Sequence, residues 1–159
     1  MTRIVAVDGH GGAGKSTFAE KLAAALGGAP VAHTDDFASW EEPLDWWPRC
    51  IRELLDPLAR GETARYEVTA WTGVPRPPAL VEPAEVVILE GVTASREAFR
   101  RYLAYAIWVD TPREVCLQRG IERDGEHMRD QWERGFESEN GYIAREHPEL
   151  HADTVVLGF

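Results

Sequence analysis

The sequence has little cysteine and no long hydrophobic run. These two absences argue against a disulfide-rich or zinc-binding protein and against a membrane-spanning one. Its two cysteines, Cys50 and Cys116, form no C-x-x-C pair, so neither a zinc site nor a redox pair is indicated. No apolar stretch approaches the length that crosses a bilayer, and no signal peptide is recognisable. We therefore expect a cytoplasmic protein with reduced thiols and no membrane partner.

Positive charge is also scarce. Lysine and arginine number 17 against 27 aspartates and glutamates, which gives a formal net charge of −10. Such a chain repels nucleic acids and anionic membranes, so neither is an expected partner. A nucleotide site is not excluded, because backbone dipoles and a few cations can build it locally. At 159 residues the chain is expected to form a single domain over residues 1–159, large enough to bury a hydrophobic core.

Glycine, by contrast, is concentrated in one informative segment. Residues 9–16 read GHGGAGKS and match G-x-x-x-x-G-K-[ST], the phosphate-binding loop (P-loop) of ATP- and GTP-binding proteins. Glycines let backbone N–H groups surround an anion, the lysine reaches the β- and γ-phosphates, and the serine hydroxyl can hold Mg²⁺. The predicted nucleotide-binding residues are Gly9, Gly11, Gly12, Ala13, Gly14, Lys15, Ser16 and Thr17.

The sequence around this loop argues against a merely flexible glycine segment. A strand-like apolar stretch at residues 4–7 precedes it, and apolar residues at helical spacing follow it. Strand, glycine-rich loop and helix is the order that phosphate binding by the loop requires.

Strand-like and helix-like segments alternate along the whole chain. Strands are expected at residues 4–7, 30–35, 86–89, 105–109 and 154–157, with helices between them, including one from about 48 to 61 and a short one from about 95 to 103. The proline-rich segment 65–83 is interpreted as an excursion over the surface. The alternation predicts an α/β fold with a mainly parallel five-stranded sheet.

Acidic residues fall where these strands end. In parallel sheets ligands bind at the carboxyl ends of the strands, which here carry Asp8, Asp35-Asp36, Glu90 and Asp110. Asp35 or Asp36 could accept the proton of a substrate hydroxyl, or instead belong to a Mg²⁺ shell or cap a turn. Glu90 could bind Mg²⁺ or make a structural hydrogen bond to the loop. The predicted metal ligands are Ser16, Glu90 and Asp35.

Two arginines lie four residues apart near the end of a predicted helix. Arg119 and Arg123 could fold over the phosphates as part of a lid-like segment near residues 119–130. The alternative is a surface face of ion pairs with Glu122 and Glu126.

Aromatic residues are crowded into the segments that follow the aspartate pair. Aromatic rings stack on flat ligands, so part of this group is expected to bind an acceptor. Trp108 and Trp132 are interpreted as packing residues instead. The predicted acceptor pocket lies between Asp35, Phe37, Trp40, Tyr66 and Trp71.

Four motifs together resemble the uridine kinases and nicotinamide riboside kinases, over the chain from the loop to about residue 124. They are DGHGGAGKST at residues 8–17, DDF at 35–37, ILEG at 88–91 and RGIERD at 119–124. In this last motif Gly120 replaces an arginine that is common in uridine kinases.

The resemblance implies a P-loop kinase three-layer sandwich, with ATP and Mg²⁺ as cofactors. The implied reaction is transfer of the γ-phosphate to a hydroxyl of a small molecule, most simply a nucleoside. It assigns Asp35 as the base, Glu90 to the metal shell and Arg123 to the lid. With Lys15 from the loop motif and Arg119 one turn before Arg123, the predicted catalytic residues are Asp35, Lys15, Arg123 and Arg119. Another metabolite or an antibiotic as acceptor stays open, as does an ATP-binding regulator with little turnover.

Overall fold

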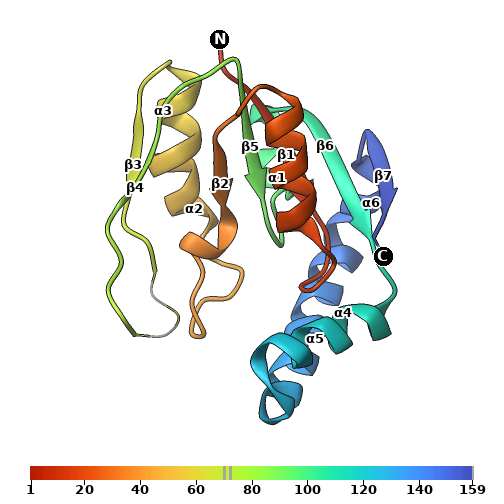
Figure 1. Ribbon diagram of the computed structural model, residues 1–159. Coiled ribbons are helices and arrows are strands. Elements are labelled where there is room, and N and C mark those ends of the chain that lie inside the picture. The colour runs from red at the N-terminus through yellow and green to blue at the C-terminus, as the bar shows by residue number, and fades with distance from the viewer. Residues whose placement is uncertain (70, 72, 159) are drawn as a thin grey trace.

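The structure is a computed structural model that describes residues 1–69, 71 and 73–158. Its centre is a five-stranded sheet in the order β2-β5-β1-β6-β7 (Figure 1). Every neighbouring pair in this sheet is parallel, so the predicted α/β fold with a mainly parallel five-stranded sheet is confirmed. The strands are β1 (Arg3–Asp8), β2 (Val31–His33), β5 (Val86–Glu90), β6 (Leu103–Asp110) and β7 (Thr154–Leu157).

Helices connect these strands. The α-helices are α1 (Lys15–Ala25), α2 (Trp47–Cys50), α3 (Asp56–Ala59), α4 (Arg113–Asp124), α5 (Arg129–Glu146) and α6 (Pro148–His151). Short 3₁₀ helices cover Thr34–Asp36, Glu97–Tyr102 and Glu126–Met128.

The helix predicted from 48 to 61 and the one predicted from 95 to 103 both depart from regular α-helix. The first runs through α2 and α3 with a π-helical stretch, Ile51–Leu55, between them. Pro57 follows this stretch, and its ring nitrogen has no hydrogen to donate to the carbonyl four residues back. The second is the 3₁₀ helix Glu97–Tyr102.

Two hydrophobic clusters cover the two faces of the sheet and give the fold its three layers. Side chains alternate along β1, so Ile4 and Ala6 enter one cluster while Val7 enters the other. The first cluster packs against the segment α2–α3 and Phe99, and the second packs against α1 and Phe136 of α5. This is the sandwich that the family resemblance implies.

The segment 65–83 is only partly an excursion. It contributes to a second, antiparallel pair of strands, β3 (Ala64–Tyr66) and β4 (Ala79–Val81). Ala64, Tyr66 and Val81 are buried in the first cluster, while Arg65 between the first two is exposed. The surface interpretation was therefore wrong for these strands, whose alternate side chains pack against the helix α2–α3.

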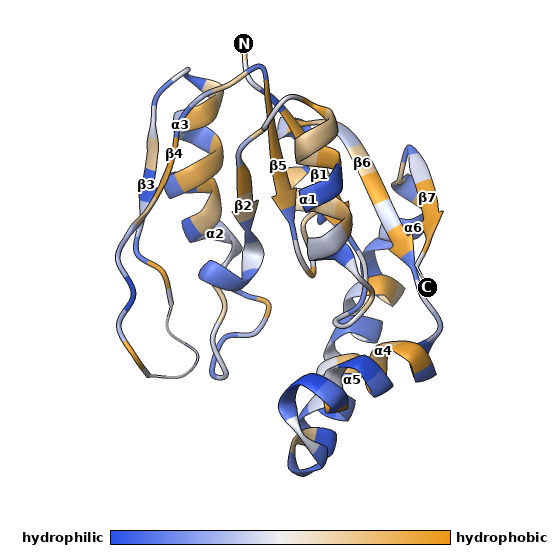
Figure 2. Ribbon diagram, in the orientation of Figure 1, coloured by the Kyte–Doolittle hydropathy of each residue, from blue (hydrophilic) through white to orange (hydrophobic). Residues whose placement is uncertain are grey.

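The carboxyl ends of the central strands open toward a polar region of the molecule. Figure 2 shows that α4 and α5, which lie beyond these strand ends, are mostly hydrophilic on their surfaces. Within the described part of the chain, no helix combines the length and apolarity that spanning a membrane would need. The cleft between the strand ends and these two helices carries the candidate site.

Candidate functional site

The P-loop connects the end of β1 to the start of α1, as the motif requires. Gly12 and Gly14 adopt φ values of 77° and 94°, a region that side chains with a Cβ atom disfavour. A Cβ at Gly12 would also lie 2.5 Å from the carbonyl oxygen of Cys116. Lys15, only 7% exposed, curls back so that its Nζ donates to the carbonyl of His10 at 2.6 Å. The loop is therefore tightly folded against the rest of the domain.

A buried carboxylate at the base of the loop ties three elements together. Asp8 is fully buried and accepts hydrogen bonds from the backbone N–H groups of Gly9, Thr93 and Ser95 at 2.7, 3.0 and 3.1 Å. The hydroxyls of Ser95 and Tyr142 each donate to it at 2.7 Å. Burial raises the pKa of Asp8, and these hydrogen bonds oppose the rise by favouring the charged form. Sequence patterns place Asp8 at a strand end but do not show these distant donors.

Ser16 and Glu90 bring two oxygen donors together beside the loop. The Ser16 hydroxyl donates to Glu90 Oε1 at 3.1 Å, and Nδ1 of His33 lies 2.5 Å from the same oxygen. The hydrogen bond to Glu90 is the main cause that raises the pKa of His33. Hard oxygen donors of this kind fit Mg²⁺, which binds through a few carboxylates or hydroxyls plus substrate phosphates. Among the described residues, no group of three or more His, Cys, Asp and Glu side chains could hold a metal by itself.

The two adjacent aspartates have different surroundings. Both lie in the 3₁₀ turn Thr34–Asp36 rather than at the end of the expected strand, because β2 ends at His33. Asp36 is buried, accepts a hydrogen bond from Tyr66 at 3.2 Å and pairs with Arg76 at 3.6 Å. Asp36 therefore holds the turn against β3 and the loop beyond it.

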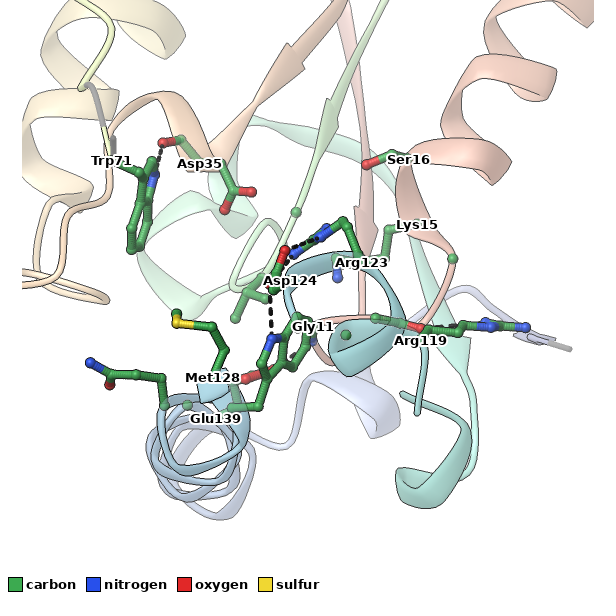
Figure 3. A pocket seen from close by; sticks show the side chains of 18 of the residues that line it. Gly11, Lys15, Ser16, Asp35, Trp71, Arg119, Arg123, Asp124, Met128 and Glu139 are labelled. Carbon is green, nitrogen blue, oxygen red and sulfur yellow. Dashed lines mark hydrogen bonds and ion pairs between the residues drawn. The ribbon is translucent and has the colours of Figure 1, made fainter. Parts of the chain in front are cut away.

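Asp35 instead faces the cleft that the P-loop lines (Figure 3). Its carboxylate is accessible to solvent, yet the surrounding protein removes enough water to raise the pKa of Asp35. The positive charges of Lys15 and Arg123 act against this rise. No hydrogen bond among the described residues joins Asp35 to Ser16 or Glu90, its predicted companions as metal ligands.

The two predicted lid arginines lie on α4 and line the same cleft. Nη1 of Arg119 donates to the carbonyl of Gly12 in the P-loop at 3.3 Å. Arg123 makes two hydrogen bonds to Asp124, at 2.9 and 3.2 Å, and its guanidinium lies 5.4 Å from the ring centre of Trp132. Neither arginine pairs with Glu122 or Glu126, but Arg123, whose side chain is largely exposed, does form an ion pair with its neighbour Asp124.

Trp132 of α5, interpreted from the sequence as a packing residue, also lines the cleft. Its ring lies against Gly120, where a Cβ would be 2.3 Å from Cε2, and its Nε1 donates to Asp124 at 2.9 Å. The ring therefore explains why this chain has glycine where uridine kinases commonly have arginine. A glycine inside a helical pattern was the only sequence signal of this contact.

The predicted acceptor residues separate into two groups. Trp40 and Trp71 line the cleft with Asp35, their rings edge to face at 4.9 Å, and Nε1 of Trp71 donates to the carbonyl of Asp35 at 2.9 Å. Phe37 and Tyr66 are both only 3% exposed and stack on each other in the core at 4.4 Å. The cleft holds about 740 Å³, within the range of small-molecule sites.

A further acidic residue reaches the P-loop from α5, and no sequence motif identified it. Glu139 is 8% exposed, and its Oε1 accepts a hydrogen bond from the backbone N–H of Gly11 at 2.6 Å. Nδ1 of His10 lies 3.3 Å from the same oxygen. Two residues that are 128 positions apart in the sequence thus meet in the phosphate-binding loop.

Comparisons with known proteins agree with this geometry. A family model described as the phosphoribulokinase/uridine kinase family matches residues 44–144. The uridine kinase of Klebsiella pneumoniae (strain 342) is 38% identical over 89 residues, which cover 54% of this chain and 42% of that one. The uridine kinase of Escherichia coli (strain K12) is 39% identical over 77 residues, or 46% of this chain and 36% of that one. Each match thus spans less than half the length of the curated relative.

Solved structures show the same fold at low sequence identity. A protein described as a possible uridine kinase from Bacillus stearothermophilus superposes with a TM-score of 0.75 at 19% identity, over 97% of this chain and 88% of that one. Shikimate kinase from Bacteroides thetaiotaomicron gives a TM-score of 0.53 at 16% identity, over 98% of this chain and 86% of that one.

Proposed function

The chain belongs to the phosphoribulokinase/uridine kinase family, and on that premise we propose that it is an ATP-dependent small-molecule kinase. It would transfer the γ-phosphate of ATP to a hydroxyl group, with a nucleoside as the favoured acceptor. The observation that carries the proposal is that Lys15 and Asp35 line one cleft (Figure 3). Phosphoryl transfer needs a cationic group such as a lysine at the phosphates of ATP. It also needs a group such as a carboxylate that can accept the proton of the acceptor hydroxyl.

The roles of the site residues follow from their positions. The backbone N–H groups of the P-loop and the Lys15 ammonium would bind the phosphates of ATP. Asp35 would take the proton of the acceptor hydroxyl as the new O–P bond forms and ADP leaves. Ser16 and Glu90 would hold Mg²⁺, which neutralises phosphate charge when bound. Asp35 is proposed as a base and, because it does not contact these two, less readily as a metal ligand.

The arginines of α4 would act on the phosphate side of the cleft. Arg119 already contacts the P-loop carbonyl of Gly12, which places its charge beside the loop. Arg123 is held by Asp124 and by the ring of Trp132 at the rim. Both could offset the negative charge that is redistributed among the phosphate oxygens during transfer.

The acceptor would bind on the side of the cleft that Trp40 and Trp71 form. We expect Trp40→Ala to weaken acceptor binding by about 1–3 kcal/mol, the scale of stacking between a base and an aromatic side chain, without changing the affinity for ATP. Trp71→Phe keeps a ring but removes the hydrogen bond to the Asp35 carbonyl, and should weaken acceptor binding less than Trp71→Ala. Acceptor and ATP titrations followed by tryptophan fluorescence and by KM measure both effects.

A suitable control is Tyr105→Ala, which removes an exposed aromatic ring of β6 that does not line the cleft. It should change neither KM. If the variants at Trp40 and Trp71 bind the acceptor as well as the wild type does, the acceptor site lies elsewhere.

The proposed activity is tested by ADP release from ATP and Mg²⁺ with a panel of acceptors. The panel contains nucleosides, sugars, hydroxylated acids and hydroxyl-bearing antibiotics. Rapid ADP release that depends on one nucleoside supports the proposal. Release that depends on a different class would make the protein a kinase of another small molecule. Tight ATP binding with no acceptor-dependent release would instead indicate a nucleotide-binding regulator.

A further inference from the structure

The carboxylate of Glu139 lies against the P-loop. It contacts the glycine-rich part of the loop, whose N–H groups point toward a bound anion in phosphate-binding loops. Its Oε1 is 2.6 Å from the backbone nitrogen of Gly11, a short hydrogen bond of the kind that an ionised carboxylate accepts. Residue Gly11 belongs to the glycine-rich part of the motif, whose amides serve phosphate binding in P-loop proteins. An acidic side chain of this protein therefore shares a donor with the proposed nucleotide site.

The position of Glu139 is well defined by its neighbours on α5. One turn before it, Phe136 is buried in the second hydrophobic cluster and contacts the ring of His10 at a centroid distance of 5.6 Å. The same three-residue step after it, the Tyr142 hydroxyl donates to the buried Asp8. Because both ends of this stretch are anchored, the Glu139 carboxylate can change partners by rotating its side chain without moving the helix.

Glu139 also borders the acceptor side of the cleft. It lines the main cleft together with Lys15, and it lines an adjoining cavity of about 460 Å³ together with Asp35, Trp40 and Trp71. The same carboxylate thus faces the proposed phosphate site and the proposed acceptor site. An acceptor with hydroxyl or amino donors could offer it a hydrogen bond in place of the one from Gly11.

A carboxylate at this point opposes the binding of phosphates for two physical reasons. It occupies the Gly11 N–H, and its negative charge, on a side chain that is itself largely buried, repels a second anion nearby. Rotation toward the acceptor would remove both effects. Because binding free energies are linked reciprocally, an acceptor that draws the carboxylate away tightens ATP binding, and ATP tightens acceptor binding equally.

We propose that Glu139 is a positioning residue that weakens ATP binding at Gly11 until an acceptor draws its carboxylate away, so that the two substrates bind cooperatively. This inference rests on the proposed kinase function. If so, the enzyme hydrolyses little ATP when no acceptor is bound, because the loop binds the nucleotide tightly only when an acceptor is present.

The test compares MgATP binding, without acceptor, to the wild type and to Glu139→Gln. Glutamine keeps an oxygen that can accept the Gly11 N–H but removes the negative charge. We expect Glu139→Gln to bind MgATP at least about 5-fold more tightly, the lower end of typical coupling between sites. ADP release without acceptor should rise in parallel. Isothermal titration and a coupled ADP assay measure the two effects.

Two further variants separate charge from packing. Glu137→Gln makes the same change at an exposed position of α5 and should leave both quantities unchanged. Glu139→Asp keeps the charge and should bind MgATP like the wild type or between it and Glu139→Gln. If Glu139→Gln does not fold, the Glu139→Asp variant still tests the proposal. A Glu139→Asp protein that binds MgATP more weakly than the wild type would contradict it.

The outcomes distinguish this inference from the function on which it rests. A wild type that binds no MgATP, either alone or together with any acceptor of the panel, would overturn the proposed function and the inference with it. A wild type that binds MgATP, with a folded Glu139→Gln that binds it no more tightly, would overturn the inference alone. In that case Glu139 would be a brace that fixes the shape of the loop.

Discussion

Replacement of Lys15 by methionine should lower kcat by about 10²-fold or more, with the fold retained. Methionine keeps most of the length and apolar volume of the lysine side chain, so the change removes chiefly the positive charge. That charge would act on the β- and γ-phosphates, where negative charge is redistributed during transfer. Initial rates at saturating ATP and acceptor measure the effect.

The Lys15→Met experiment needs a variant that retains the fold and a matched control on the same helix. Among the described residues, the Lys15 ammonium donates to the carbonyl of His10, and loss of this hydrogen bond from a charged group should cost about 1.5–3 kcal/mol of stability. Lys21 lies exposed on the same helix, α1, so Lys21→Met makes the same chemical change away from the cleft. It should leave kcat unchanged. Near-normal turnover in a folded Lys15→Met protein would contradict the kinase proposal.

Replacement of Asp35 by asparagine should also lower kcat by about 10²-fold or more while leaving ATP binding intact. Asparagine preserves the shape of the side chain but cannot accept the proton of the acceptor hydroxyl. Asp36→Asn is the matched variant one residue away, in the same turn. Because Asp36 bonds to Tyr66 and Arg76 and not to the cleft, its loss should mainly loosen the turn and cost much less in kcat.

The pH dependence gives an independent check on Asp35. A base works only when deprotonated, so kcat should fall as the pH drops through the pKa of Asp35. The surrounding protein removes part of the water around the carboxylate and so raises that pKa, which moves the acidic limb to higher pH than an ordinary aspartate would give. The limb should persist in Asp36→Asn and vanish from the residual activity of Asp35→Asn. An inactive Asp36→Asn beside an active Asp35→Asn would reverse the assignment of the base.

Local patterns in the sequence were sufficient to predict the strands of the central sheet and the P-loop side of the candidate site. The apolar runs predicted all five strands of the central sheet. For the central strands the reason is that buried parallel strands need continuous apolar residues whatever their partners. The edge strand β7 kept an apolar run although its side chains are not buried. The P-loop was equally readable, since its glycines, lysine and serine act within one short segment. Strand ends also located Asp35 and Glu90 at the correct edge of the sheet.

Features that depend on contacts between distant segments could not be read in this way. Phe37 and Tyr66 looked like acceptor residues beside Trp40 and Trp71, because composition alone does not tell which aromatic rings face a cleft and which stack in the core. The burial of Tyr66 follows from the pairing of β3 with β4 and their packing on the helix α2–α3. The contacts of Asp8 with Tyr142 and of Gly11 with Glu139 likewise join residues more than 120 positions apart.

The contact between Gly120 and Trp132 also limits how the protein can change. A side chain of any size at residue 120 would overlap the indole ring, so the arginine common at this position in uridine kinases and Trp132 exclude each other. The two positions are therefore coupled: the effect of a substitution at residue 120 depends on which side chain stands at residue 132. A consensus substitution chosen from relatives would fail at residue 120 unless residue 132 were reduced in size in the same step.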